Sequence, residues 1–246
     1  PRKFNDERGC FYETFKERLD GFMILDLLRG GEPLELIITF FSRLFVIFCT
    51  MPIHEYAHAL IATKLGDSTP KYNGRLTLNP MAHISPMGAI MIFLCGFGYA
   101  KPVNVNPRNF KDPKKGMAFT AIAGPISNLI MGFIAIFIST IFARFYYNNP
   151  STLFLAIYYF LYFAGVVNVN LAVFNLLPIP PLDGSRILQL LIPAKYYFKF
   201  MQYERYVVLI VFVLILSGVL SGPLSYISGL IIGLFTNIAK LPFIIF

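Results

Sequence analysis

The pentad His54-Glu55-Tyr56-Ala57-His58 combines the residue types of a zinc site with the spacing that such a site needs. Histidines four positions apart lie one turn apart on the same face of a helix, so both imidazoles can bind one Zn²⁺ ion. Glu55 follows the first histidine, and a carboxylate in that position can act as a general base. The pattern therefore predicts a helix that holds one zinc ion through His54 and His58, with Glu55 as the catalytic base.

A catalytic zinc site needs a third protein ligand and an open position for water. The chain offers few candidates: Glu204 lies in a basic connection, His83 in a proline-rich loop, and Asp183 beyond a long apolar segment. Asp183 is better placed. It follows the cytoplasmic end of that segment, and the segment that contains the histidine pair also ends on the cytoplasmic side, as the charge distribution below indicates. Three prolines precede it, and proline breaks a helix, so an extended chain can turn back toward the metal there.

The elements that position these residues belong in a membrane. Of the 246 residues, 56% are apolar and only 14% are charged, although the net charge is +8. Soluble proteins carry about 25% charged residues, so this composition argues against a soluble enzyme. Lys and Arg are scattered between apolar runs rather than clustered on a polar domain, which argues against nucleic-acid binding. The cysteines, Cys10, Cys49 and Cys95, form no CxxC pair and so predict no thiolate zinc site.

A helix of about 20 apolar residues crosses the bilayer core. The sequence predicts an all-α polytopic membrane protein in which three core transmembrane helices, at 34–65, 117–145 and 153–177, carry the zinc site. Shorter apolar segments at 206–220 and 224–238 predict either one full C-terminal span or two tilted ones. The run 87–99 is too short to cross, so we expect a re-entrant or interfacial segment, with glycines around Phe97 that could expose the strand edge of a β-hairpin. Residues 1–33 predict an amphipathic helix on the membrane surface, and residues 34–246 form the membrane-embedded domain.

Charge predicts the orientation in the membrane. The connection between the first two core spans is rich in Lys and Arg and has only two acidic residues, Asp67 and Asp112. A second basic connection follows Asp183. By the positive-inside rule both connections are cytoplasmic, so we expect a multi-pass protein of the cell membrane with its site toward the cytoplasmic side. Arg43, on the outer side of the first span, is expected to extend outward to the membrane surface.

Several ordered motifs between Leu34 and Gly184 resemble those of one enzyme family. The HExxH pentad, with Asn175-Leu176-Leu177-Pro178 running into Leu182-Asp183-Gly184, resembles the paired signature of site-2 proteases, zinc enzymes that cut other proteins within the membrane. Further motifs match the compact subgroup without PDZ or CBS domains: Gly124-Pro125-Ile126-Ser127-Asn128, the segment Arg75 to Pro80, and the segment Gly96 to Val103. The resemblance implies that His54, His58 and Asp183 are the ligands and Glu55 the base. Ser85 departs from the subgroup, which usually has Asp there, so no role is assigned to the His83 loop.

The resulting hypothesis is a zinc-dependent intramembrane endopeptidase that hydrolyses peptide bonds in or near transmembrane segments, as in regulated intramembrane proteolysis. Asn175 lies seven residues after Asn168, so both occupy one helix face, and an amide near the metal could bind the substrate backbone or the developing oxyanion. Helix packing is the alternative for both, and we expect Gly124, Pro125 and Asn128 to serve packing. The expected partners are a membrane-protein substrate with a transmembrane helix, the lipid bilayer and an adaptor protein, and no nucleic acid.

Three alternatives stay open from the residues. A metal or proton transporter could use His54, His58 and Asp183 as a transit site, although no pseudo-symmetric halves are visible. An inactive relative could bind membrane proteins without cutting them, although the ligand set is complete. A protease of the CAAX-processing type would need a downstream glutamate ligand, and Glu204 fits that role poorly.

Overall fold

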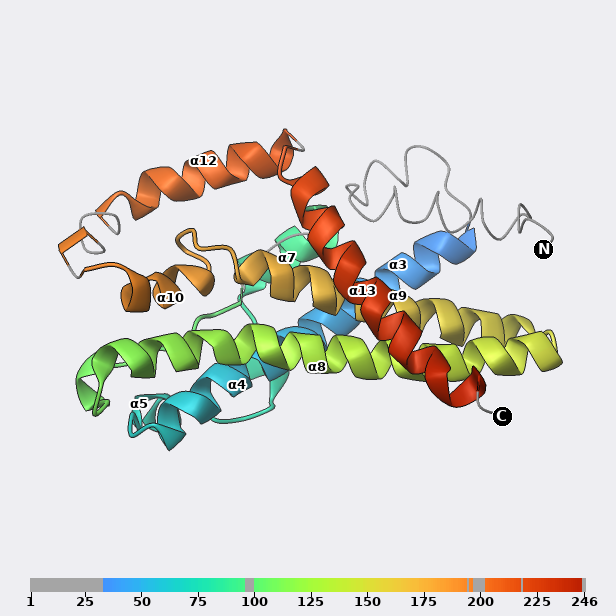
Figure 1. The fold of residues 1–246 in the computed structure, drawn as a ribbon, viewed down its shortest axis with the longest axis horizontal. Coiled ribbons are helices and arrows are strands. Elements are labelled where there is room, and N and C mark those ends of the chain that lie inside the picture. The colour runs from blue at the N-terminus through green and yellow to red at the C-terminus, as the bar shows by residue number, and fades with distance from the viewer. Residues whose placement is uncertain (1–32, 96–99, 194, 197–201, 218, 245–246) are drawn as a thin grey trace.

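The computed structural model describes residues 33–95, 100–193, 195–196, 202–217 and 219–244, which form helices and connections with no strand among them (Figure 1). The expected amphipathic segment before residue 33 and the glycines around Phe97 lie outside the described residues. Within the described ranges, four helices are long and apolar enough to cross a membrane: Phe40–Lys64, Pro113–Asn148, Thr152–Asn175 and Gly222–Pro242. The all-α polytopic architecture is confirmed.

The first core span is one continuous rod made of three parts: α3 (Pro33–Phe45), a π-helical turn η1 (Val46–Thr50) and α4 (Met51–Lys64). Pro52 sits in the first turn of α4 and is buried. Its ring cannot donate a backbone hydrogen bond to the preceding turn and clashes with the carbonyl there, which accounts for the wider turn at η1. Arg43, near the end of α3, is only 6% exposed, so the expectation that it extends outward was wrong.

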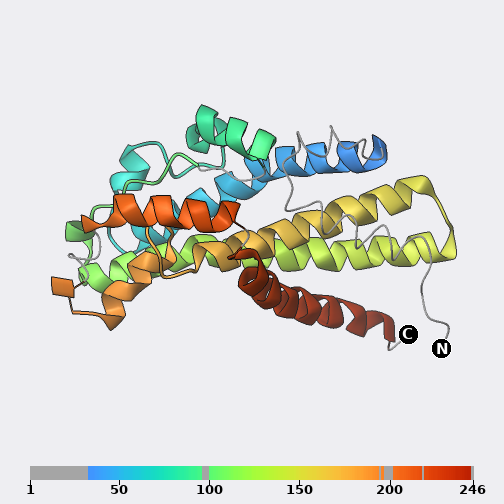
Figure 2. The same ribbon diagram turned by 90° about the horizontal axis from the view of Figure 1, so that it is seen from above.

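The other two core spans are α8 (Pro113–Asn148) and α9 (Thr152–Asn175), which lie side by side as a helical hairpin (Figures 1 and 2). Asp112 caps α8, accepting hydrogen bonds from the backbone N–H groups of Lys114 and Lys115, each at 3.1 Å. A Cβ added to Gly132 would lie 3.2 Å from the Gly165 carbonyl oxygen. These two glycines therefore let the backbones of α8 and α9 approach closely, as small residues do in membrane helix pairs.

The part of the connection from α4 to α8 that the structure describes contains the short helices α5 (Thr69–Tyr72), α6 (Pro80–His83), α7 (Pro86–Cys95) and η2 (Pro107–Asn109). Its expected apolar segment at 87–99 is helical over α7, and residues 100–106 form neither helix nor strand. His83 is fully buried and its Nε2 lies 2.8 Å from the Thr77 carbonyl oxygen. The buried Arg75 guanidinium donates hydrogen bonds to the carbonyl oxygens of Ala82 and Lys101. Arg75 and His83 therefore link separate parts of this connection through hydrogen bonds from their side chains to its backbone.

Asp67 ties the end of α4 to the chain just before α8. Its carboxylate is fully buried and accepts hydrogen bonds from Thr69 Oγ1 at 2.6 Å, Asn106 N at 2.7 Å and Asn109 Nδ2 at 2.7 Å. Burial raises the pKa of Asp67, but these hydrogen bonds lower it by more, so it lies below its ordinary value. Near these hydrogen bonds of Asp67, Ala62 of α4 packs against Phe110 and Met117.

We expect Asp67→Ala to destabilise the fold by about 2 kcal/mol or more at neutral pH, because it removes several hydrogen bonds to a buried charge. Since the folded-state pKa of Asp67 is depressed, its contribution is fully present above the unfolded-state pKa of about 3.9 and is lost as the pH falls through the folded-state value. Thermal unfolding in detergent from pH 7 downward should show the gap between wild type and variant closing under acid.

The exposed cap Asp112 offers a matched control, and Asp112→Ala should cost only about 1 kcal/mol. A gap for Asp67→Ala that stayed constant down to the lowest pH would contradict the role given to its carboxylate.

After α9 the described residues include the helices α10 (Gly184–Leu191), α12 (Glu204–Leu216) and α13 (Ser221–Ile244). α13 packs across α8 and α9 and is long enough to cross the membrane, whereas α12 has only 13 residues (Figure 1). Of the two C-terminal arrangements expected, the described residues support one full span. Its helix begins before the expected residue 224, because Pro223 sits in its first turn, where proline needs no N–H partner, and it ends at Ile244, beyond the expected residue 238.

Candidate metal centre

His54 and His58 project from successive turns of α4, and both are buried. Their rings stand edge to face, 4.6 Å apart between centroids, and the two Nε2 atoms are 3.0 Å apart. This is the arrangement expected from their spacing of four residues. Both nitrogens therefore face one point beside the helix.

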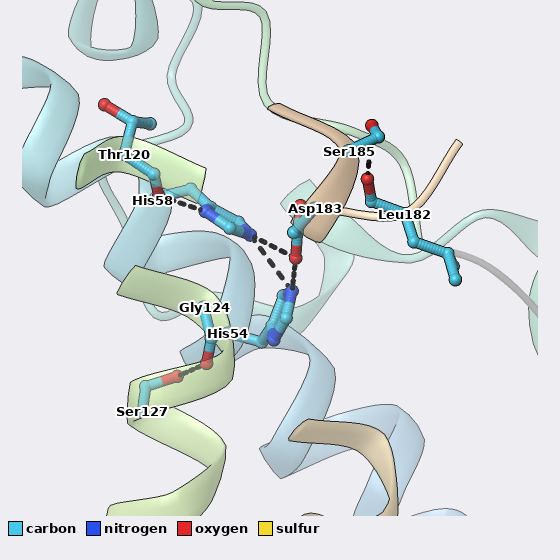
Figure 3. A network of polar contacts seen from close by, with 8 residues as sticks. All are labelled: His54, His58, Thr120, Gly124, Ser127, Leu182, Asp183 and Ser185. Atoms are coloured by element: carbon cyan, nitrogen blue, oxygen red, sulfur yellow. Dashed lines mark hydrogen bonds and ion pairs between the residues drawn. The ribbon is translucent and has the colours of Figure 1, made fainter. Parts of the chain in front are cut away.

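Asp183 reaches the same point from the turn between α9 and α10 (Figure 3). Its Oδ2 lies 3.2 Å from His54 Nε2 and 3.3 Å from His58 Nε2. The chain leaves α9 at Asn175 and turns back, and Ser185 secures this turn by donating from Oγ to the Leu182 carbonyl at 2.7 Å. The structure thus brings the aspartate to the histidine pair, while His83 is not in the group of potential ligands found among the described residues. The side chain of Glu204 lies outside the described part of the chain.

Gly184 allows Asp183 to take this position. A Cβ at residue 184 would lie 2.3 Å from the carbonyl oxygen of Leu176 and 2.4 Å from that of Leu177. No side chain fits in this space, because backbone atoms cannot move aside as a flexible side chain can. The Asp-Gly pair is therefore more than a simple turn: its glycine lets the start of α10 pack onto the end of α9.

The three candidate ligand atoms fit a zinc ion. Zinc bonds to histidine nitrogen and carboxylate oxygen are about 2.0–2.2 Å long, so neighbouring ligands of a tetrahedral ion are roughly 3.3–3.5 Å apart. The observed separations of 3.0, 3.2 and 3.3 Å are close to these distances between neighbouring ligands. Two histidines and a carboxylate also leave one tetrahedral position open, as catalytic zinc sites do.

Hydrogen bonding orients the His58 ring for this role. His58 Nδ1 lies 2.7 Å from the carbonyl oxygen of Thr120 on α8, an acceptor only, so Nδ1 carries the proton and Nε2 keeps its lone pair (Figure 3). His54 Nδ1 is buried and has no hydrogen-bond partner among the described residues. The two histidines therefore differ in how they are held.

The site packs directly against Gly124 of α8. A Cβ at this residue would lie 2.4 Å from His58 Nε2 and 2.6 Å from His54 Nε2. The sequence assigned Gly124 to helix packing, and the structure adds that its missing side chain leaves room for the candidate ligand atoms. The motif Gly124-Pro125 can be recognised in the sequence. Its contact with the histidines cannot be read from the sequence, because it depends on how α4 lies on α8.

The remaining predicted residues lie around the ligands. Glu55 is partly buried on α4 beside His54, and Asn175 is the last residue of α9, also partly buried. Asn168 is fully buried and donates from Nδ2 to Thr50 Oγ1 at 3.2 Å and to the Ala164 carbonyl at 2.8 Å. Asn168 therefore joins α9 to η1, in agreement with the packing role.

Comparison with known proteins assigns the family. The sequence profile of "Peptidase family M50" matches residues 42–218. The "Putative zinc metalloprotease YwhC" of Bacillus subtilis is 40% identical over 181 residues, which cover 72% of this chain and 83% of that protein. The "Zinc metalloprotease MJ0392" of Methanocaldococcus jannaschii is 27% identical over 185 residues, 68% of this chain and 44% of that protein.

No solved structure matches the chain significantly. The relatives give no support to the transporter alternative. Since the profile covers more than half of the chain and the Bacillus relative is aligned over most of its length, the chain belongs to peptidase family M50 and is a zinc metalloprotease with membrane-spanning helices.

Proposed function

We propose that this protein cleaves peptide bonds in or near the transmembrane segments of membrane proteins, with His54, His58 and Asp183 as the ligands of one zinc ion and Glu55 as the general base. The observation that carries the proposal is the convergence of three ligand atoms, 3.0 to 3.3 Å apart, beside helices that are long and apolar enough to span a membrane. Ionisable groups at such depth are costly and are functional candidates by default.

The chemistry divides between the ion and the chain. Zinc, when bound, lowers the pKa of a water ligand to about 7 and polarises the scissile carbonyl. Glu55 lies next to His54 in the sequence, so its carboxylate can accept a proton from the attacking water and deliver it to the nitrogen of the leaving amine. His58 keeps its ring orientation during this transfer through the bond from Nδ1–H to Thr120.

The placement of the site supports access from the basic side of the membrane. His58 lies six residues before Lys64, the exposed last residue of α4, which corresponds to roughly 9 Å along a helix. The Asp183 side chain is 21% exposed. Water therefore has a short route to the ligands from this end, and the surrounding Lys and Arg favour the cytoplasm for it. We propose the cell membrane as the location.

Two finer assignments belong to the same proposal. Asn175 ends α9 shortly before the turn that carries Asp183, so its amide is suited to bind the backbone of an unwound substrate or the developing oxyanion. Residues 34–246 act as the protease domain, while residues 1–33, the membrane helices or an adaptor protein select the substrate.

Zinc removal tests the function. Purified protein in lipid vesicles, mixed with a single-span reporter that has Gly or Pro in its membrane segment, should cut the reporter within or near that segment, because these residues ease local unwinding. A chelator should stop the cleavage and added zinc should restore it. Mass spectrometry of the fragments gives the cleavage position.

A reporter with a purely Leu-based membrane segment provides the control and should be cut more slowly. Cleavage that survives complete zinc removal would contradict the proposal. So would vesicles that take up metal ions but leave every reporter intact.

A further inference from the structure

Three polar side chains gather one helical turn from His54, where η1, α8 and α9 meet. Thr50 lies one turn before His54, and Asn168 of α9 donates to its hydroxyl at 3.2 Å. Asn128 lies one turn after Gly124 on α8. All three side chains are at most 1% exposed. Such a polar layer in an apolar bundle needs its hydrogen bonds satisfied, because a buried unpaired polar group is costly.

The packing of α4 on α8 places Asn128 at this level. The two helices run antiparallel: Ala62 packs near Met117, His58 Nδ1 contacts the Thr120 carbonyl, and the His54 ring lies against Gly124. Continuing this register by one turn sets Asn128 opposite the start of α4. Figure 3 shows that the second nitrogen of the His54 ring faces away from Asp183.

Three buried polar atoms of this region have no hydrogen-bond partner among the described residues: His54 Nδ1, Asn128 Oδ1 and Asn168 Oδ1. When Nε2 of a histidine binds a metal, Nδ1 carries a proton and is a donor, and it almost always donates to an outer partner. The two amide oxygens are acceptors. A donor without an acceptor thus lies one helical turn from the layer that contains acceptors without a donor.

We infer that Asn128 is a positioning residue of the zinc site, whose amide oxygen accepts the hydrogen bond from His54 Nδ1–H and so keeps Nε2 directed at Asp183. The bond is made after a rotation of the amide or through one buried water, which is nearly as favourable in enthalpy. The Asn128 amide oxygen thereby orients the His54 ring, as the Thr120 carbonyl orients the His58 ring. This inference rests on the proposed role of His54 as a zinc ligand.

Asn128 suits the role better than Asn168. The amide of Asn168 is already held by Thr50 and by the Ala164 carbonyl, so it acts in joining α9 to η1. Asn128 shares a face of α8 with Gly124, the residue against which the His54 ring packs. The two asparagines therefore serve as test residue and control. Asn128 is expected to affect zinc binding, and Asn168 is expected to affect only the packing of the helices.

The test measures zinc affinity by competition with a chromophoric chelator, using the full chain in detergent. Asn128→Leu should bind zinc about 10- to 100-fold more weakly than wild type, the usual cost of losing an outer partner of a metal ligand. Asn128→Asp keeps an acceptor oxygen and should bind within a few-fold of wild type. Asn168→Leu should bind zinc as wild type does, although its metal-free form should unfold at a lower temperature.

A spectroscopic measurement separates orientation of the ligand from stability. The visible spectrum of the Co²⁺-loaded protein reports the geometry of the ligands, so Asn128→Leu should change it and Asn168→Leu should not. Should Asn128→Leu fail to fold, Asn128→Ala takes its place in both measurements. Zinc affinity of the folded variant within twofold of wild type would overturn the inference, as would an equal loss in Asn168→Leu.

His54→Ala distinguishes failure of this inference from failure of the proposed function. If His54→Ala loses zinc while Asn128→Leu keeps full affinity, the zinc site stands and only the role of Asn128 is wrong. If His54→Ala binds zinc as tightly as wild type, the proposed ligand set itself is wrong and the inference falls with it.

Discussion

Glu55→Gln should cut the reporter about 10²- to 10⁴-fold more slowly than wild type, the usual contribution of a positioned general base. Glutamine has nearly the same shape as glutamate but cannot accept the proton of the attacking water at neutral pH. Glu55 is not part of the group His54, His58 and Asp183, so the zinc content should stay at the wild-type level. Initial cleavage rates and metal analysis on the same preparation give both quantities.

Glu204→Gln is the matched control, because Glu204 begins α12, outside the three core spans. Its cleavage rate should equal that of wild type. A Glu55→Gln protein that keeps zinc and still cuts at the wild-type rate would refute the proposed mechanism. Loss of zinc from that variant would instead assign Glu55 to metal binding.

Gly124→Ala should lose zinc binding and slow cleavage by more than about 100-fold, since displacements near 1 Å in a catalytic site can cost that much. The added methyl would lie 2.4 to 2.6 Å from ring atoms of His54 and His58, distances that carbon and nitrogen atoms cannot share. The imidazoles must rotate away, which separates the ligand atoms. Because side chains rather than backbone give way, the helices should stay folded.

Gly132→Ala is the control on the same helix. Its methyl would meet Val169 Cγ2 at 3.1 Å and the Gly165 carbonyl oxygen at 3.2 Å, contacts between α8 and α9 that are remote from the ligands. It should lower the unfolding temperature but keep zinc. Chelator competition and thermal unfolding of both variants suffice, and a Gly124→Ala protein with wild-type zinc affinity would show that the site has more room than the structure gives it.

The candidate ligands were predictable because local rules determine them. Helical periodicity alone brings His54 and His58 together, and the prolines after Asn175 indicate a chain that leaves its helix and can return. In the structure, Asp183 Oδ2 lies 3.2 Å from His54 Nε2. The core spans were predictable for a similar reason, since length and apolar composition decide what can cross a bilayer.

Features that depend on contacts between helices were not predictable in the same way. Gly124 was expected to serve packing, and its contact with the histidines follows only from the antiparallel register of α4 on α8. Arg43 was expected to reach outward but is buried, because neighbouring parts of the protein cover it. Asp67 drew attention only as one of two acids in a basic connection, since two of its hydrogen-bond partners, Asn106 and Asn109, lie about 40 residues away in the sequence.

The long connection between the first two core spans has a consequence for the kinetics of local opening. Surface loops usually exchange their backbone hydrogen bonds readily, but this one is fastened by three buried polar side chains, Asp67, Arg75 and His83. Releasing a hydrogen bond to a charged group costs about 1.5–3 kcal/mol each time. The described parts of this connection, residues 65–95 and 100–112, should therefore open as a cooperative unit with the ends of α4 and α8 rather than residue by residue. We therefore expect the motions that admit a substrate to the proposed site to occur elsewhere in the bundle.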